Sequence, residues 1–346
     1  MVEVDDPHCL DGALMPSQNP RLFGHDAAQT FLATAYRCGR LHHAILIEGP
    51  EGVGKATLAF RFAYHLLTHP EPSSAPDTLH DPDLTRPEIR PVIQAASHDV
   101  LHIRRPVEAK TGRLKSAIIV DEIRRVGRFC HQTSGTGRYR IVILDTADSL
   151  NRSAANALLK ILEEPLQQTV FLVLSHAPGQ LLPTIRSRCL TLRLTSLDRA
   201  DFARAVMALD LPVEHTDEQA MERLHEAARG SVSEAIRLLN YGGLEIMAAL
   251  DGLFDEGKPL DRAALHRLVD EVTGRQREVA FDFLLNLVRR RLQTRALTAA
   301  KSGHLARAAR LAESDHALES RIGDALVYNL DRKQLVLDIV SELAAQ

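Results

Sequence analysis

The sequence predicts an α/β domain with a parallel sheet between helices, followed by two all-helical domains. Short apolar strands alternate with amphipathic helices up to about residue 194, and a glycine-rich loop joins the first strand to the helix that follows it. Such alternation is typical of a parallel sheet covered by helices on both faces. After residue 194 only helical periodicity continues. We therefore expect a nucleotide-binding-like α/β domain over 1–194, a small helical domain over 195–245 and a larger helical domain over 246–346.

The composition indicates a soluble protein of a reducing compartment. The 42 basic and 45 acidic residues give a net charge of −3, so the whole chain has no strong electrostatic attraction for nucleic acid. The 4 cysteines stand far apart without a C-x-x-C pair, which argues against a metal knuckle and a disulfide framework. The first residues are acidic, and no apolar run approaches the roughly 18 residues that span a bilayer. We expect a cytoplasmic protein without membrane contact.

The first predicted strand and helix enclose the glycine-rich loop. HAILIEG, His43 to Gly49, is apolar and short enough to be a buried strand. From Lys55 to Leu67 apolar residues recur at helical spacing, and Pro70 ends the pattern. A strand, a glycine-rich turn and a helix in this order are the setting in which phosphate-binding loops occur.

The loop GPEGVGKAT departs from the phosphate-binding pattern G-x-x-x-x-G-K-[ST] at one position. Its glycines let backbone N–H groups point at phosphates, and its lysine supplies positive charge. The hydroxyl that would hold magnesium is missing because position 56 is alanine. The next side chain carries a hydroxyl but is turned by about 100 degrees around the helix, away from the metal. We predict a degenerate nucleotide site formed by Gly49, Gly52, Gly54, Lys55, Thr57 and, from a later strand, Asp145.

Further strands and helices complete the predicted α/β domain. The stretch from Pro70 to Pro91 is polar, holds six prolines and is expected to be irregular. The predicted strands are VLHIRR (100–105), RIVILD (140–145) and TVFLVLS (169–175). Helices are expected around 121–130 and 149–165, and the second has an apolar face formed by Ala155, Leu158, Leu159 and Leu162.

The remaining chain contains amphipathic helical segments. Helices are expected around 197–209, 217–230 and 231–240, with breaks at Tyr241 to Gly243 and at Asp255 to Pro259. A longer helix follows, because apolar residues recur there at helical spacing. These are Phe281, Leu284, Leu285, Val288 and Leu292.

An ATP-hydrolysing site of this type needs a second strand that ends in an acidic pair, and two segments compete for that place. SAIIVDEIRR carries Asp121 and Glu122, but a short strand followed by two acids that cap the next helix explains this segment without catalysis. RIVILDTAD carries Asp145, followed by Thr146 where a glutamate is needed. Judged by themselves, the two segments leave the choice open.

NALLKILEEP, Asn156 to Pro165, follows closely behind Asp145 and resembles the hallmark segment of the clamp-loader branch of the AAA+ ATPases. Other segments that resemble the same family are LLPTIRSRC (181–189), RLFGH (21–25) and GRLHHAILIEGPEGVGK (39–55). The resemblance covers nearly all of the predicted α/β domain. It implies an AAA+ domain, a helical lid and a helical collar through which subunits assemble. It also implies that Asp145 and Thr146 correspond to the family's acidic pair.

Within this family, RIVILDTADSLN and NLDRKQLVLDI (329–339) look more like the delta-prime type of subunit than the ATP-hydrolysing gamma/tau type. The resemblance implies that a hydrolytic subunit has a hydroxyl after the loop lysine, a glutamate after the strand aspartate and a sensor arginine farther on. Ala56, Thr146 and Ser233 stand at these places. Losing one such group usually lowers the rate by about 10² or more, and the roles are coupled. We expect no ATPase activity and no required cofactor, with ATP or ADP at most bound without hydrolysis.

Arg188 of the Ser-Arg-Cys motif is the catalytic residue that the resemblance implies. In such assemblies this arginine reaches the ATP site of the neighbouring subunit, where its guanidinium stabilises charge on the transferring phosphoryl group. An ordinary surface ion pair is the alternative. Glu163 and Glu164 stand at the end of a predicted helix, where negative charge opposes the helix dipole, and such a departure often marks a site or an interface. The implied partners are gamma/tau and delta subunits, the polymerase holoenzyme, the sliding clamp and primer-template DNA.

Metal binding is not expected. Many clamp-loader subunits carry a four-cysteine zinc module after the loop helix, but no cysteine lies between Cys38 and Cys130, so we predict no zinc. His65 and His69 have metal-ligand spacing on a helix, yet no third ligand is evident.

The basic run Arg289 to Arg291 has two interpretations, a solvated helix face or a contact with DNA or a partner. Aromatic residues are scarce and tryptophan is absent, so any DNA contact is expected to involve the phosphate backbone.

Two other functions stay open. The chain could be a clamp-loading ATPase that uses Thr57 and an unrecognised carboxylate, or a stand-alone nucleotide-binding regulator.

Overall fold

The chain forms two compact units, which span residues 1–235 and 236–346. The computed structural model describes residues 8–108, 114–131, 139–164, 168–209, 211, 218–253, 261–274, 277–328 and 330–344. The three domains expected from the sequence are a finer division, with boundaries at 195 and 246. That division stays a prediction.

The first unit is built on a sheet of five parallel strands. Their order across the sheet is β2 (Val100–Arg104), β3 (Arg140–Asp145), β4 (Thr169–Ser175), β1 (Ala44–Glu48) and β5 (Leu190–Arg193). All neighbouring strands pair in parallel, so their carboxyl ends lie at one end of the sheet. The predicted parallel sheet is confirmed, and the four predicted strands form where the sequence indicates them.

The sequence does not predict β5. This strand has only four residues, and its side chains alternate between partly buried and exposed. It pairs with β1 alone, at the margin of the sheet. An apolar run long enough to be recognised is therefore absent.

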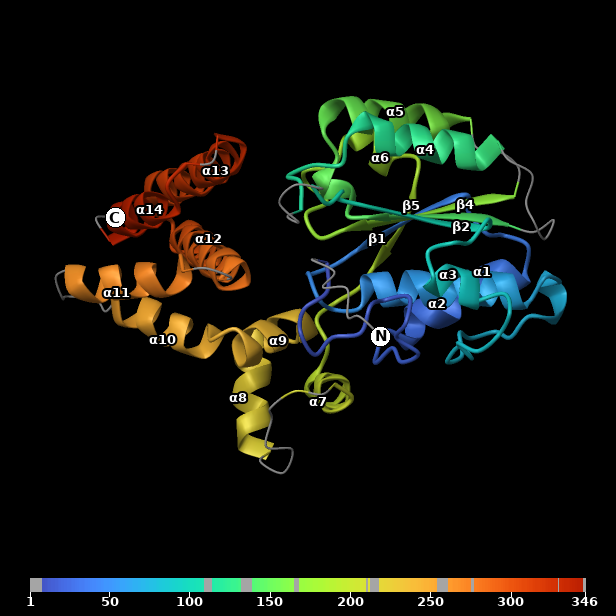
Figure 1. Cartoon of the computed structure of the whole chain (residues 1–346), viewed down its shortest axis with the longest axis horizontal. Coiled ribbons are helices and arrows are strands. Elements are labelled where there is room, and N and C mark those ends of the chain that lie inside the picture. Colours follow the sequence, from blue (N-terminus) through green and yellow to red (C-terminus); the bar gives the residue numbers. More distant parts are fainter. Residues whose placement is uncertain are drawn as a thin grey trace. The chain divides into compact units, whose positions relative to one another are not determined.

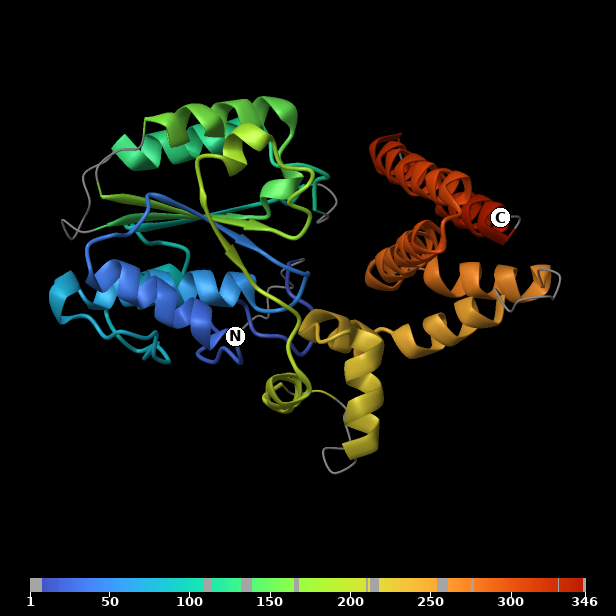
Figure 2. The ribbon, with the colours of Figure 1, turned by 180° about the vertical axis from the view of Figure 1, so that it is seen from behind.

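Helices cover both faces of the sheet, as Figure 1 shows and Figure 2 repeats from behind. One face carries α1 (Asp26–Arg37), α2 (Lys55–Thr68) and α3 (Arg90–Ile93). The other face carries α4 (Val120–His131), α5 (Arg152–Glu163) and α6 (Pro183–Arg186). The short 3-10 helices η1 (Pro72–Ser74) and η2 (Ala147–Ser149) lie in the connections.

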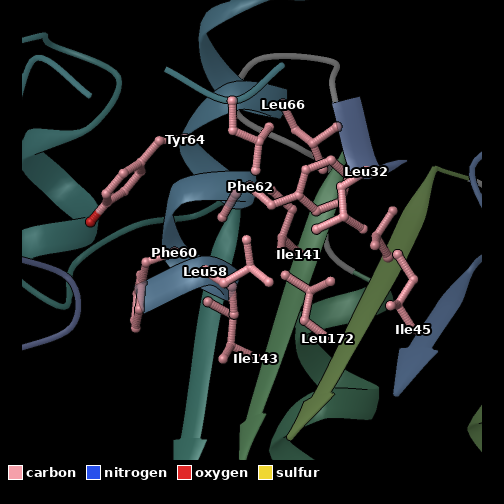
Figure 3. Close-up of a cluster of buried hydrophobic side chains, with 14 of the residues drawn as sticks. Leu32, Ile45, Leu58, Phe60, Phe62, Tyr64, Leu66, Ile141, Ile143 and Leu172 are labelled. Atoms are coloured by element: carbon pink, nitrogen blue, oxygen red, sulfur yellow. The ribbon is translucent and has the colours of Figure 1, made fainter. Parts of the chain in front are cut away.

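Alternate residues of the strands feed two cores. On the first face, Leu58 and Phe62 of α2 pack over Ile143 and Leu172 (Figure 3). On the second face, Ala155, Leu158 and Leu162 of the predicted apolar side of α5 are buried, and Leu159 is partly buried against them. The burial of apolar side chains in these two cores is the main stabilising contribution to the unit.

The sequence predicts one connection between the regular elements correctly and another one wrongly. The stretch from Pro70 to Pro91 is irregular as predicted, apart from η1 and the start of α3, and it buries Leu79 and Ile89 in the first core. The predicted short strand before α4 is wrong. Ile118 makes only an isolated bridge, and the helix already begins at Val120. The two acids of SAIIVDEIRR therefore lie in the first turn of a helix, where they complement the helix dipole.

In the described part of the chain after β5, the regular elements are all helices. In the first unit these are α7 (Arg199–Met207), α8 (Glu218–Ala228) and the start of α9 (Val232–Asn240). The second unit contains the rest of α9, α10 (Gly243–Leu253), α11 (Arg262–Val272), α12 (Glu278–Lys301), α13 (Leu305–Tyr328) and α14 (Arg332–Ala344).

The second unit agrees with the predicted helical pattern. The break predicted at Tyr241 to Gly243 separates α9 from α10, whereas the one at Asp255 to Pro259 lies outside the described residues. All five apolar residues predicted to line one face of α12 are buried. Among the described residues, none of the helices combines the length and apolar character that a membrane span requires.

Candidate functional site

The glycine-rich loop lies at the carboxyl end of β1. Gly52 and Gly54 have φ values of 75° and 104°, which favour glycine because it has no Cβ. At Gly49 an added Cβ would lie 2.5 Å from the carbonyl oxygen of Leu194, just after β5. Backbone conformation and close packing therefore both require glycine in this loop.

Lys55 begins α2, and its side chain is turned back into the loop. Its Nζ donates hydrogen bonds to the carbonyl oxygens of Gly49, at 2.7 Å, and Pro50, at 2.5 Å. The residue is only 7% exposed. Burial lowers the pKa of the Lys55 ammonium to about 8, although nearby carboxylates act in the opposite direction. The lysine thus finds its hydrogen-bond partners within its own loop.

Residues from the segment around the start of α9 close one side of the loop. Ser231 Oγ donates to the Glu51 carbonyl at 2.8 Å, and the Val232 N–H donates to the Gly52 carbonyl at 3.0 Å. An added Cβ at Gly52 would lie 2.4 Å from Ser231 Oγ and 2.7 Å from Ser233 Oγ. The structure therefore places Ser233 directly against the loop.

The segment RLFGH lies against the loop as well. Nε2 of His25 is 2.8 Å from the Val53 carbonyl oxygen, at hydrogen-bond distance. An added Cβ at Gly54 would lie 2.9 Å from Leu22 Cδ1. Each carbonyl from Gly49 to Val53 consequently has a polar partner from this chain.

Two carboxylates follow β3, close to the loop lysine. Asp145 ends the strand, and its Oδ2 is 3.6 Å from Nε2 of His102 on β2. Asp148, which the sequence analysis did not single out, has a side chain only 4% exposed. It accepts hydrogen bonds from Ser175 Oγ at 2.7 Å and from the His176 N–H at 2.8 Å. Both carboxylates raise the pKa of the loop lysine and thus act on it electrostatically.

The residues at the hydrolytic positions make structural contacts. Ala56 packs against the first core, and the Thr146 hydroxyl lies 3.1 Å from Ser149 Oγ. Within the described part of the chain, no hydrogen bond of the Thr57 hydroxyl is found. The site therefore combines a buried lysine with two carboxylates and has no hydroxyl residue directly after the lysine.

Glu48 is a further residue that the sequence analysis did not single out. It ends β1 directly before the loop, and its side chain is only 5% exposed. Its carboxylate lies 3.3 Å from Nε of Arg193 and 3.9 Å from Nε of Arg186. A charged residue at the end of an otherwise apolar strand is the signal that could have found it.

Arg188 lies after α6, beside the end of α5. One guanidinium nitrogen donates to the Thr184 carbonyl at 3.0 Å, and the other is 2.7 Å from Glu163 Oε1. Both side chains of the ion pair are partly exposed, 35% for the arginine and 43% for the glutamate. This contact gives the glutamate at the carboxyl end of α5 a local role.

Comparison with known proteins identifies the family. Residues 24–198, about half of the chain, match the sequence model of the family described as DNA polymerase III, delta subunit. The chain belongs to this family. The match runs through the glycine-rich loop, Asp145 and Arg188.

Curated relatives agree with this family. The DNA polymerase III subunit delta' of Pseudomonas aeruginosa is 36% identical over 201 residues, which cover 58% of this chain and 56% of the relative. The subunit delta' of Escherichia coli is 32% identical over 158 residues, 46% of this chain and 44% of its own. The subunit tau of Escherichia coli is 28% identical over 247 residues, 68% of this chain and 36% of its own. The predicted resemblance to delta-prime clamp-loader subunits is confirmed.

The similarity has a limited extent along the relatives. The chain spans about half the length of the delta-prime subunits and about a third of the tau subunit. Together with the parallel sheet and its glycine-rich loop, the family match confirms the predicted AAA+ fold, and the helical second unit confirms the predicted helical part.

Among the described residues of this delta-prime relative, no group of three or more His, Cys, Asp or Glu side chains is arranged to hold a metal ion. His65 is buried, with ring centroids 5.8 Å from Tyr36 and 4.7 Å from His69. His65 therefore belongs to the core. The absence of zinc stays a prediction.

Replacing His65 with glutamine is expected to reduce the acid sensitivity of the fold. Burial, together with His69 and His80, lowers the pKa of His65 to about 4, whereas the unfolded chain has a pKa near 6.5. The free energy of unfolding is not reduced by His65 above about pH 6.5. It falls as the pH drops from about 6.5 toward 4, because His65 then takes up a proton in the unfolded chain but not in the folded protein. The shift corresponds to about 3 kcal/mol. In urea unfolding, the free energy of unfolding should fall by about 3 kcal/mol less between about pH 7 and pH 4 in the variant than in wild type. The same change at exposed His316 is the control, and equal losses in all three proteins would contradict the assignment.

The basic run at Arg289 forms contacts within the second unit. Arg289 lies 3.1 Å from Asp315, and Arg291 lies 2.6 Å from Asp251. These ion pairs favour the interpretation of the run as a helix face.

Proposed function

We propose that this chain is a clamp-loader subunit of DNA polymerase III that does not hydrolyse ATP and supplies Arg188 to the ATP site of a neighbouring subunit. Its partners in the polymerase holoenzyme are the gamma/tau and delta subunits, and the assembly acts on the sliding clamp and primer-template DNA in the cytoplasm. Membership of the delta-subunit family and similarity to delta-prime subunits support this assignment.

The observation that carries the proposal is the state of the glycine-rich loop. Hydrolysis requires a hydroxyl on magnesium and a carboxylate that activates the attacking water. Ala56 and Thr146 lack these groups, and Lys55 donates to two carbonyls of its own loop. Engaging a phosphate would require breaking these two charge-assisted bonds. Binding of ATP or ADP is compatible with this loop, but turnover is not.

The contacts of the two arginines in the IRSRC segment support Arg188 as the residue that acts in trans. Arg186 lies 3.9 Å from buried Glu48 of its own β1. Arg188 is held by the partly exposed Glu163, and such exposed ion pairs contribute only about 0 to 1 kcal/mol. Arg188 can therefore leave Glu163 for a phosphoryl group of ATP bound to a neighbouring subunit with little loss of stability in its own chain.

The purified chain is expected to show no sustained ATP hydrolysis. The reason is the missing hydroxyl and glutamate, which the retained lysine cannot replace. Phosphate release with magnesium, in the presence and absence of primed DNA, measures the rate. The Lys55→Ala variant should give the same background. Sustained hydrolysis that this substitution abolishes would overturn the proposal.

Two other functions give different results in simple assays. A gamma/tau-like ATPase is favoured by the similarity to the tau subunit over 68% of the chain, and it requires turnover in the assay just described. A stand-alone nucleotide-binding regulator requires that the chain bind ATP tightly and not associate with other clamp-loader subunits. Co-purification with those subunits would contradict this third function.

A further inference from the structure

The turn between α12 and α13 carries a concentration of positive charge. We define the basic tip as residues 294–312, the last turns of α12, the turn and the first turns of α13. This stretch contains no aspartate or glutamate. Its basic residues are Arg295, Lys301, His304, Arg307 and Arg310. Since acids outnumber bases in the chain as a whole, 45 to 42, the tip is a local reversal of charge.

Most of the charged side chains of the basic tip are exposed, whereas Arg295 is half-buried. Lys301, Arg307 and Arg310 all lie at the surface, and Gly303, with φ of 81°, makes the turn between the helices. Within the described residues, no ion pair engages Lys301, Arg307 or Arg310. The arginines nearer the middle of α12 differ, because Arg289 is paired with Asp315 and Arg291 with Asp251. Lys301, Arg307 and Arg310 therefore leave positive charge at the surface of the tip.

The position of one arginine is unfavourable for the helix that carries it. Arg307 lies in the first turn of α13, which has no acidic residue there, and Arg310 lies in the second turn. The helix dipole favours negative charge in the first turn, so the positive charge of Arg307 is unfavourable for the helix. The spacing of three between the two arginines places them on the same side of the helix. A positive charge that opposes the helix dipole and has no ion pair among the described residues indicates a role other than stabilising the helix.

We propose that the basic tip binds the phosphate backbone of DNA. Lysine and arginine are the side chains that contact phosphates, and such contacts need no base recognition. Residues 294–312 contain no phenylalanine, tyrosine or tryptophan, the side chains on which bases most often stack, so contacts with the backbone are favoured. The residues between the charges are mostly alanine, with Ser302 and Gly303 in the turn and leucines at positions 297 and 305.

An acidic protein segment is the other class of polyanion that the charge could attract. It would also use the exposed side chains of Leu297 and Leu305, which are 62% and 71% exposed. Single exposed leucines are ordinary on protein surfaces, whereas an acid-free group of exposed bases is not, so the observations favour DNA. This inference goes beyond the proposed function and does not depend on the role of Arg188.

Fluorescence anisotropy with the full chain and a labelled DNA duplex of about 30 base pairs tests the proposal. The tip variant carries Arg307→Gln and Arg310→Gln. The control carries Arg262→Gln and Arg267→Gln on exposed positions of α11, with the same change in net charge. We expect the tip variant to bind roughly 10-fold more weakly at about 50 mM salt. Its slope of log K against log salt should be smaller by about 1.8, or about 0.9 for each lost phosphate contact. The control should stay within about twofold of wild type.

Several results would overturn the proposal. These are equal binding by wild type and tip variant, equal losses in tip variant and control, and no binding by wild type at low salt. Unchanged DNA binding with loss of binding to a polyglutamate peptide would assign the tip to an acidic protein instead. Far-UV circular dichroism checks that the variants fold, and Lys301→Gln, at the end of α12, gives a second and milder test with a smaller loss. Arg188→Ala should bind DNA as wild type does, so this result is independent of the proposed function.

Discussion

Replacing Arg188 with alanine is expected to abolish most ATP hydrolysis at the site of the neighbouring subunit while the complex still assembles. An arginine supplied in trans is worth about 10³ to 10⁵ in rate. Its planar, permanent charge stabilises the phosphoryl oxygens as negative charge spreads over them in the transition state. The measurement is the steady-state ATPase rate of a clamp loader reconstituted with this chain, the sliding clamp and primed DNA. Only the sites that Arg188 serves should slow.

The structure supplies the controls for this experiment. Among the described residues, the contacts that Arg188 loses are those to the Thr184 carbonyl and to Glu163, both at the surface, so the fold should lose less than about 1 kcal/mol. Arg188→Lys keeps the charge but loses the guanidinium fork, and it should also be slow. Arg152→Ala, at an exposed position of α5, should leave the rate unchanged. An unchanged rate with Arg188→Ala would remove the trans role, and loss of assembly would make Arg188 an interface residue instead.

The predictable parts of the fold are those whose signal lies within one segment. β1 and β4 are buried along their whole length, so each appears in the sequence as an uninterrupted apolar run. The face of α12 is buried at helical spacing and is equally visible. β5 escapes prediction because its four residues alternate in exposure and its pairing with β1 is long-range.

The candidate site divides in the same way. The glycines and lysine of the loop lie within a few residues of one another, so a sequence pattern finds them. The hydrogen bond from Ser231 to the Glu51 carbonyl of the loop is not predictable, because the two residues are 180 positions apart in the chain and no local pattern links them. Asp148 is missed because its burial depends on partners at the end of β4, and a sequence does not show which strand lies beside β3.

Gly49→Ala is the second substitution for which we expect a large effect, a loss of about 3 kcal/mol in the free energy of unfolding. An added Cβ would lie 2.5 Å from the carbonyl oxygen of Leu194, which is backbone and not a flexible side chain. Neither backbone segment can move away easily, because both are held by backbone hydrogen bonds. The Leu194 N–H donates to the Glu48 carbonyl oxygen at 2.7 Å, and the Gly49 N–H donates to the Ser175 carbonyl oxygen at 3.2 Å. Overpacking that moves backbone costs about 1 to 3 kcal/mol, and strained hydrogen bonds place this site at the upper end.

Urea unfolding followed by far-UV circular dichroism measures the effect of Gly49→Ala. The control is Gly127→Ala in α4, where a Cβ meets open space and alanine should stabilise the helix by about 0.5 to 1 kcal/mol. Equal stabilities of Gly49→Ala and wild type would mean that the loop and the segment after β5 can separate without cost. The expected loss instead gives the glycine a structural reason that is independent of nucleotide. The packing of β1 against the segment after β5 would then require Gly49 whether or not the loop binds nucleotide.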